Sequence, residues 1–151
     1  MNEDDLMILD KFIKSSSRIL LSGTSCIGKT HFNSYLNEHG YGKMWQMNFF
    51  KFLSTGKLIF NFGCAAAYEE DVTDGKGIIL IGAPYKIYLE RRKERGKARK
   101  KGNDDRDKFK ENYIKCIKKF EEYNIPHILI DNRNDCLILD KSSFIAMLTE
   151  K

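Results

Sequence analysis

The sequence predicts a three-layer α/β domain in which a five-stranded parallel sheet is flanked by helices. Its short aliphatic segments show no polar alternation, which is typical of strands that are covered on both faces. Segments with helical spacing separate these strands, as in parallel sheets with helical crossovers. The chain has 151 residues, of which 42% are hydrophobic, enough to bury one core. We therefore expect a single domain over residues 1–151.

Five segments are predicted to be the strands of this sheet. Each is a run of apolar or aromatic residues between polar or glycine-containing turns. They are Arg18–Ser22, Met44–Phe49, Leu58–Phe62, Ile78–Ile81 and His127–Ile130.

The segments between the strands are predicted to be helical. Asn2 and Asp140 are suitable N-caps, and Gly40 suits a left-handed C-terminal cap. The expected helices cover residues 2–14, 29–39, part of 50–56, a turn or two within 65–70, a basic stretch from 84, residues 105–123, and 141–148.

The glycine loop, which we define as Gly23 to Thr30, is the motif that carries chemistry. It reads Gly23-Thr24-Ser25-Cys26-Ile27-Gly28-Lys29-Thr30 and fits GxxxxGK[ST] between a predicted strand and a predicted helix. Glycines let backbone N–H groups surround a phosphate, and a helix N-terminus favours an anion. The pattern predicts that these residues bind ATP, that Lys29 reaches the β- and γ-phosphates, and that Thr30 binds Mg²⁺.

A second feature is the basic excess between Lys86 and Lys101. This segment holds nine Lys or Arg residues and two acids, a net charge of +7 in a chain whose formal total is +5. Arg91, Arg95 and Arg99 recur at intervals of four and share one helix face, as a phosphate clamp requires. A solvated helix face is the alternative interpretation. With the glycine loop upstream, we expect a basic lid at about residues 91–107.

The segment from Ile78 to Arg95 resembles the P-loop nucleoside and nucleotide kinases. In that family a strand ending in Ala-Pro leads to a helix with Glu-Arg and a further Arg, and then to a lid; here these are Ala83-Pro84, Glu90-Arg91 and Arg95. Residues 123–132 resemble the family's last strand, so the resemblance covers about residues 18–132. It implies a compact P-loop kinase-like fold in which Lys29, Arg91 and Arg95 are catalytic, and the spacing of four adds Arg99 to this set.

The sequence departs from this family in two places. The strand Leu58–Phe62 carries Asn61 near its end, where the family commonly places an acid that binds Mg²⁺ through water or activates the acceptor. Acids follow shortly after, at Glu69, Glu70, Asp71 and Asp74. The segment 41–57 is also shorter than the family's usual acceptor module. The general base therefore stays open.

The cysteines, the histidines, the apolar stretches and the first residues indicate the redox state and the compartment to expect. The four cysteines show no CxxC pair, and the three histidines are scattered, so we expect reduced thiols and no metal site built from these residues. No apolar stretch approaches the roughly 18–20 residues that span a bilayer. The acidic start of the chain is unlike a signal peptide, which favours a cytoplasmic protein.

The sequence thus predicts an ATP-dependent, Mg²⁺-requiring phosphotransferase whose acceptor is a nucleoside or a nucleotide. A kinase that acts on DNA, at a 5′-hydroxyl or a hydroxymethylated base such as 5-hydroxymethyluracil, is an alternative in which the basic lid holds the polymer. A non-catalytic ATP-binding switch is a further alternative, favoured by the missing acid. A switch GTPase is excluded, because no Asn-Lys-x-Asp motif is present.

Overall fold

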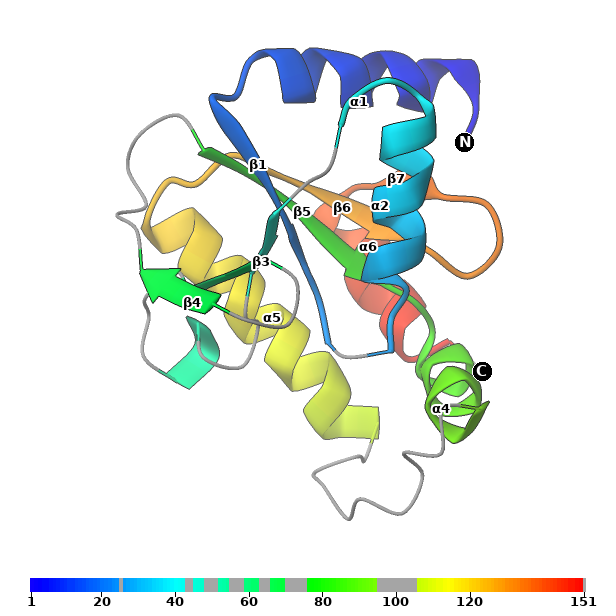
Figure 1. The fold of residues 1–151 in the computed structure, drawn as a ribbon. Coiled ribbons are helices and arrows are strands. Elements are labelled where there is room, and N and C mark those ends of the chain that lie inside the picture. The colour runs from blue at the N-terminus through cyan, green and yellow to red at the C-terminus, as the bar shows by residue number, and fades with distance from the viewer. Residues whose placement is uncertain are drawn as a thin grey trace.

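The computed structural model describes residues 1–24, 26–42, 45–47, 52–54, 59–62, 66–69, 76–94 and 106–150. Within them, helices flank a mixed β-sheet (Figure 1). The helices are α1 (Glu3–Lys14), α2 (Lys29–Glu38), α4 (Tyr85–Glu94), α5 (Arg106–Glu122) and α6 (Lys141–Leu148), with a helical turn at 52–54. The strands are β1 (Arg18–Ser22), β2 (Trp45–Met47), β3 (Ile59–Phe62), β4 (Ala66–Glu69), β5 (Lys76–Gly82), β6 (His127–Asp131) and β7 (Leu137–Leu139).

The strand order among the described residues is β4-β3-β2-β1-β5-β6-β7. Strands β2, β1, β5 and β6 are parallel, whereas β3, β4 and β7 run antiparallel to their neighbours. The prediction of a five-stranded, all-parallel sheet is therefore wrong. Of the five predicted strands, β3 is the one that runs antiparallel, because the link 48–58 from β2 is shorter than the dozen or more residues that a parallel crossover needs. The links 63–65 and 132–136 to the additional strands β4 and β7 are shorter still.

The core lies on both faces of β5. Its aliphatic residues Ile78 to Ile81 are fully buried, as the absence of polar alternation predicts. Gly77 faces the Phe12 ring of α1 and Gly82 faces the Phe144 ring of α6, so these two helices cover opposite faces. In Figure 1, α2 (cyan) lies in front of the sheet and α6 (red) behind it.

The helix ends follow the local signals of the sequence. The side chain of Asn2 accepts a hydrogen bond from the Asp5 N–H at 2.8 Å, and Asp140 accepts one from the Ser143 N–H at 2.8 Å. Gly40 has a φ of +84° after α2, as predicted. These three cap predictions are confirmed.

Two edge strands differ from the predicted elements. Residues 66–69 form β4 instead of a helical turn, because pairing with β3 overrides the helix preference of the alanines. Strand β7 was not expected, and the carboxylate of Asp5 accepts the N–H of its Ile138 at 3.1 Å. No helix in the described part of the chain is long and apolar enough to cross a membrane.

Candidate functional site

The candidate site lies where β1, β5 and β6 end. The register pairs Ser22 of β1 with Leu80 of β5, and Gly82 of β5 with Asp131 of β6, so the three strands end near one another. Each is followed by a loop, and the loop after β1 is the glycine loop (Figure 1). Ligands of open α/β sheets bind at such carboxyl ends.

The backbone of the glycine loop adopts conformations that few residues tolerate. Gly23 has a φ of +146° and Gly28 a φ of +102°, and Cys26 is left-handed at +65° although it has a side chain. A Cβ at Gly28 would also collide with the amide nitrogen of Asn132. Left-handed non-glycine residues cost on the order of 1–3 kcal/mol and gather at functional sites. Ser25 lies outside the described residues.

Lys29, the first residue of α2, folds back over the glycine loop. Its Nζ donates a hydrogen bond to the carbonyl oxygen of Gly23 at 2.9 Å. Burial lowers the pKa of Lys29 to about 8, because the loop offers its ammonium group little water. Thr30, the predicted Mg²⁺ ligand, follows it in the first turn of α2 and is exposed.

The hydroxyl group of Tyr113, in α5, connects the glycine loop to the end of β5. Its buried hydroxyl accepts the Thr24 N–H at 3.2 Å and donates to the Ile81 carbonyl at 2.7 Å. Burial raises the pKa of Tyr113, so the hydroxyl stays protonated and keeps donating. Sequence reasoning missed this residue, because its spacing marks it only as a core position of an amphipathic helix.

Arg91 of α4 lies beside the glycine loop, and its guanidinium N–H groups donate to backbone carbonyl oxygens. Nη1 donates to the Ile27 oxygen at 2.9 Å, and Nη2 donates to the oxygens of Asn132 at 2.6 Å and Arg133 at 3.0 Å. Arg91 therefore joins the loop after β1 to the loop after β6. Arg95 and Arg99 lie outside the described residues, so the predicted three-arginine clamp stays a prediction.

Asn132, directly after β6, is the second link to the glycine loop and was not predicted. Its Nδ2 donates to the carbonyl oxygens of Ile27 at 3.1 Å and Gly28 at 3.5 Å. Its backbone N–H donates to Gly82 at 2.8 Å, and its Oδ1 accepts from the Cys136 thiol at 3.2 Å. The only signal in the sequence was its place at the end of a parallel strand.

A cavity of about 310 Å³ opens between these elements. Its lining residues come from the glycine loop, α2, α4 and the loop after β6: Cys26, Gly28, His31, Arg91, Glu94 and Asn132. The volume is at the lower end of the range for small-molecule sites. His31 and Glu94 were not among the predicted site residues.

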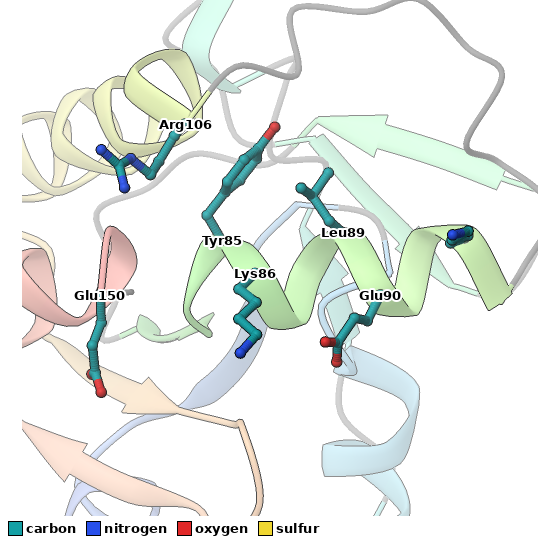
Figure 2. A pocket seen from close by; sticks show the side chains of 7 residues that line it. Tyr85, Lys86, Leu89, Glu90, Arg106 and Glu150 are labelled. Atoms are coloured by element: carbon teal, nitrogen blue, oxygen red, sulfur yellow. The ribbon is translucent and has the colours of Figure 1, made fainter.

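A second pocket, of about 540 Å³, lies on the opposite side of α4. Its lining residues are Tyr85, Lys86, Leu89, Glu90, Lys93, Arg106 and Glu150. Figure 2 shows Tyr85 and Leu89 on α4, with Arg106 coming from the start of α5 and Glu150 from near the end of the chain. Glu150 is engaged by Arg133, which binds both of its carboxylate oxygens.

The kinase family's acid near the end of the third predicted strand is absent here, and the described residues contain no cluster of acids that could take its place as a metal site. Among the described residues, no group of three or more His, Cys, Asp or Glu is arranged to hold a metal ion. Asn61 pairs with Gln46 of β2, so β3 is separated from β1 by a strand. Asp131 is buried at the site edge, but its carboxylate accepts from Arg133 at 2.9 Å. Of the acids that follow Asn61, Glu69 lies in β4 and the other three lie outside the described residues.

No protein-family model, curated protein sequence or solved structure matches this chain. Its function is therefore inferred from the residues and geometry of the site.

Proposed function

We propose that this protein is an ATP-dependent, Mg²⁺-requiring phosphotransferase of the P-loop kinase type, with a nucleoside or nucleotide as acceptor. One observation carries the proposal: a GxxxxGKT loop joins buried β1 to the N-terminus of α2, with left-handed backbone at Cys26 and Gly28. In such loops successive N–H groups and the helix dipole favour phosphate oxygens.

The side chains beside the loop suit phosphoryl transfer. Lys29 already lies over the loop, and in the proposed complex its Nζ leaves the Gly23 carbonyl for phosphate oxygens. The exposed Thr30 hydroxyl is a hard oxygen donor of the kind Mg²⁺ prefers, with phosphate oxygens and water completing the shell. When bound there, Mg²⁺ would neutralise charge on the β- and γ-phosphates. Arg95 and Arg99 are proposed to stabilise the charge that develops during transfer.

A polynucleotide acceptor is the second candidate, and the pocket of Figure 2 favours it. Tyr85 lines that pocket together with three cations, Lys86, Lys93 and Arg106. Two acids, Glu90 and Glu150, line it as well, and Glu150 is paired with Arg133. Aromatic and cationic side chains together suit a single strand, whose bases stack while its phosphates bind the cations. In this reading, a hydroxyl of DNA receives the phosphate.

The experiment is a phosphoryl-transfer screen with labelled ATP. It offers nucleosides, mononucleotides, and single- and double-stranded oligonucleotides with ordinary and hydroxymethylated bases. We expect label on a nucleoside or mononucleotide, and loss of transfer in Lys29→Ala. Label on oligonucleotides alone, weakened by Lys86→Ala and Lys93→Ala but not by the matched control Lys118→Ala on α5, would select the polynucleotide acceptor. ATP binding with no transfer to any acceptor would contradict the enzyme assignment.

A further inference from the structure

We propose that Asn132 and Cys136 are positioning residues that aim the backbone of the glycine loop at phosphate, an inference that rests on the proposed function. Two consecutive hydrogen bonds lead from the loop after β6 to the glycine loop. The Cys136 thiol donates to Asn132 Oδ1 at 3.2 Å, and Asn132 Nδ2 donates to the Ile27 carbonyl at 3.1 Å. Neither residue has to touch the ligand to act in this way.

The Ile27 carbonyl is the atom on which this arrangement acts. It accepts from Asn132 Nδ2 at 3.1 Å and from Arg91 Nη1 at 2.9 Å, which together occupy both of its lone pairs. The peptide bond is planar, so the N–H of Gly28 points away from this carbonyl. Holding the Ile27 oxygen toward Asn132 and Arg91 therefore fixes the direction of the Gly28 N–H. Hydrogen bonds at the carbonyl also polarise the peptide and strengthen that donor.

The Ile27 carbonyl and the Cys136 thiol together fix which way the Asn132 amide faces. A carbonyl can only accept, so Nδ2 must face Ile27, and Oδ1 must face a donor. Cys136 supplies that donor, and burial raises the pKa of the Cys136 thiol, which keeps its proton in place. Asn132 is 3% exposed, and its backbone N–H donates to the Gly82 carbonyl. Water therefore has little access to Asn132.

The experiment separates positioning of the loop from a merely structural tie. Binding of Mg-ATP and of inorganic tripolyphosphate is measured by calorimetry, together with the thermal midpoint, for the parent, Asn132→Ala, Cys136→Ala and Cys136→Ser. The matched control is Asn134→Ala, an exposed asparagine two residues along the same loop. A merely structural tie would alter the midpoint and the binding-competent fraction but leave the dissociation constant unchanged.

We expect Asn132→Ala to weaken both ligands about ten-fold or more, since a loop donor loses its orientation. Cys136→Ala should weaken them several-fold, and Cys136→Ser, whose hydroxyl still donates, should bind like the parent. The affinity for tripolyphosphate should fall by the same factor as the affinity for Mg-ATP, because the substitutions change the glycine loop that binds the phosphates. Asn134→Ala should leave both affinities unchanged.

The possible failures are distinguishable. If the parent binds both ligands and all the Asn132 and Cys136 variants bind as tightly, the positioning role is overturned and the proposed function stands. If the parent binds neither ligand, the proposed function fails and the positioning role fails with it. If Asn132→Ala does not fold, the Cys136 pair decides, because equal affinities of the Ala and Ser variants contradict the proposal.

Discussion

The charge of Lys29 depends on whether the glycine loop is empty or binds a phosphate. Burial lowers its pKa to about 8 from the ordinary 10.5. The unfolded chain keeps this proton up to about pH 10.5, so the contribution of Lys29 to stability rises with pH between about 8 and 10.5. A bound phosphate has the opposite effect on the lysine, because a nearby negative charge favours its protonated form.

Mg-ATP binding should consequently be coupled to proton uptake near pH 8.5, about half a unit above this pKa. Calorimetry in two buffers of different ionisation enthalpy measures the number of protons taken up. Lys29→Arg is the control, because a guanidinium stays charged throughout this range. A parent that takes up no more protons than Lys29→Arg would show that Lys29 does not meet the phosphates.

At the scale of single residues, the sequence predicted the glycine loop but not its partners. A fixed spacing of glycines and Lys29 is a local signal, and the structure brings these residues to the end of β1. Asn132 and Tyr113 act through contacts set by the register of β6 and the packing of α5, which no local pattern encodes. The spacing of the arginines predicted that Arg91 lies near the phosphate site. It did not predict that the guanidinium donates its hydrogen bonds to backbone carbonyls.

The ends of α2 and α5 show how single residues determine an element. After α2, the Tyr41 N–H bonds to Leu36 at 3.0 Å and the left-handed residue is Gly40. After α5, the Ile125 N–H bonds to Phe120 at 2.8 Å and the left-handed residue is Asn124. Both are Schellman-type ends, in which one left-handed residue lets the last carbonyls find partners.

Replacing Gly40 with alanine should lower the free energy of unfolding by about 1 kcal/mol. Nothing lies within 4 Å of the added Cβ, so the cost comes from the backbone conformation alone. Urea unfolding measures it, and Asn124→Gly is the comparison, expected to be neutral or slightly stabilising because glycine adopts a positive φ freely. An unchanged urea midpoint in Gly40→Ala would contradict this description of the α2 end.

At the scale of elements, caps and buried strands were predictable, and edge strands were not. The aliphatic run of β5 indicates burial on both faces by itself. Strands β4 and β7 are short and depend on hairpin partners, so their state follows from pairing and not from their own composition.

Over the whole molecule, Tyr113 joins three parts of the fold at the site. Its hydroxyl contacts the glycine loop and the end of β5, while its ring packs against Phe109 of α5 and Phe144 of α6. The core beneath the loop thus fixes the position of the Thr24 backbone.

Tyr113→Phe should lower the free energy of unfolding by about 1–3 kcal/mol, because the Thr24 N–H and the Ile81 carbonyl each lose a buried partner. Urea unfolding is the measurement, with Tyr123→Phe as control, since Tyr123 is 45% exposed. Equal stabilities of the two variants would show that the Tyr113 hydroxyl does not support the loop.

The α/β class was predictable from the whole chain, but the direction of its strands was not. Helical spacing between aliphatic runs indicates helices on both faces of a sheet. Direction depends on whether each connection is long enough to cross over, and residues 48–58 before β3 are not. The parallel strands β1, β5 and β6 that form the candidate site were nevertheless among those expected.

The most direct test of ATP binding by the glycine loop is a calorimetric titration of Mg-ATP into the parent chain and into Lys29→Ala. We expect saturable binding by the parent and a loss of at least about a hundred-fold in affinity in Lys29→Ala, because the lysine supplies the loop's own charge toward the phosphates. The urea midpoint of the variant should stay at or above that of the parent, since the buried lysine does not stabilise the empty fold below pH 8. Absence of binding by the parent, or equal affinity in Lys29→Ala, would show that the glycine loop is not an ATP site.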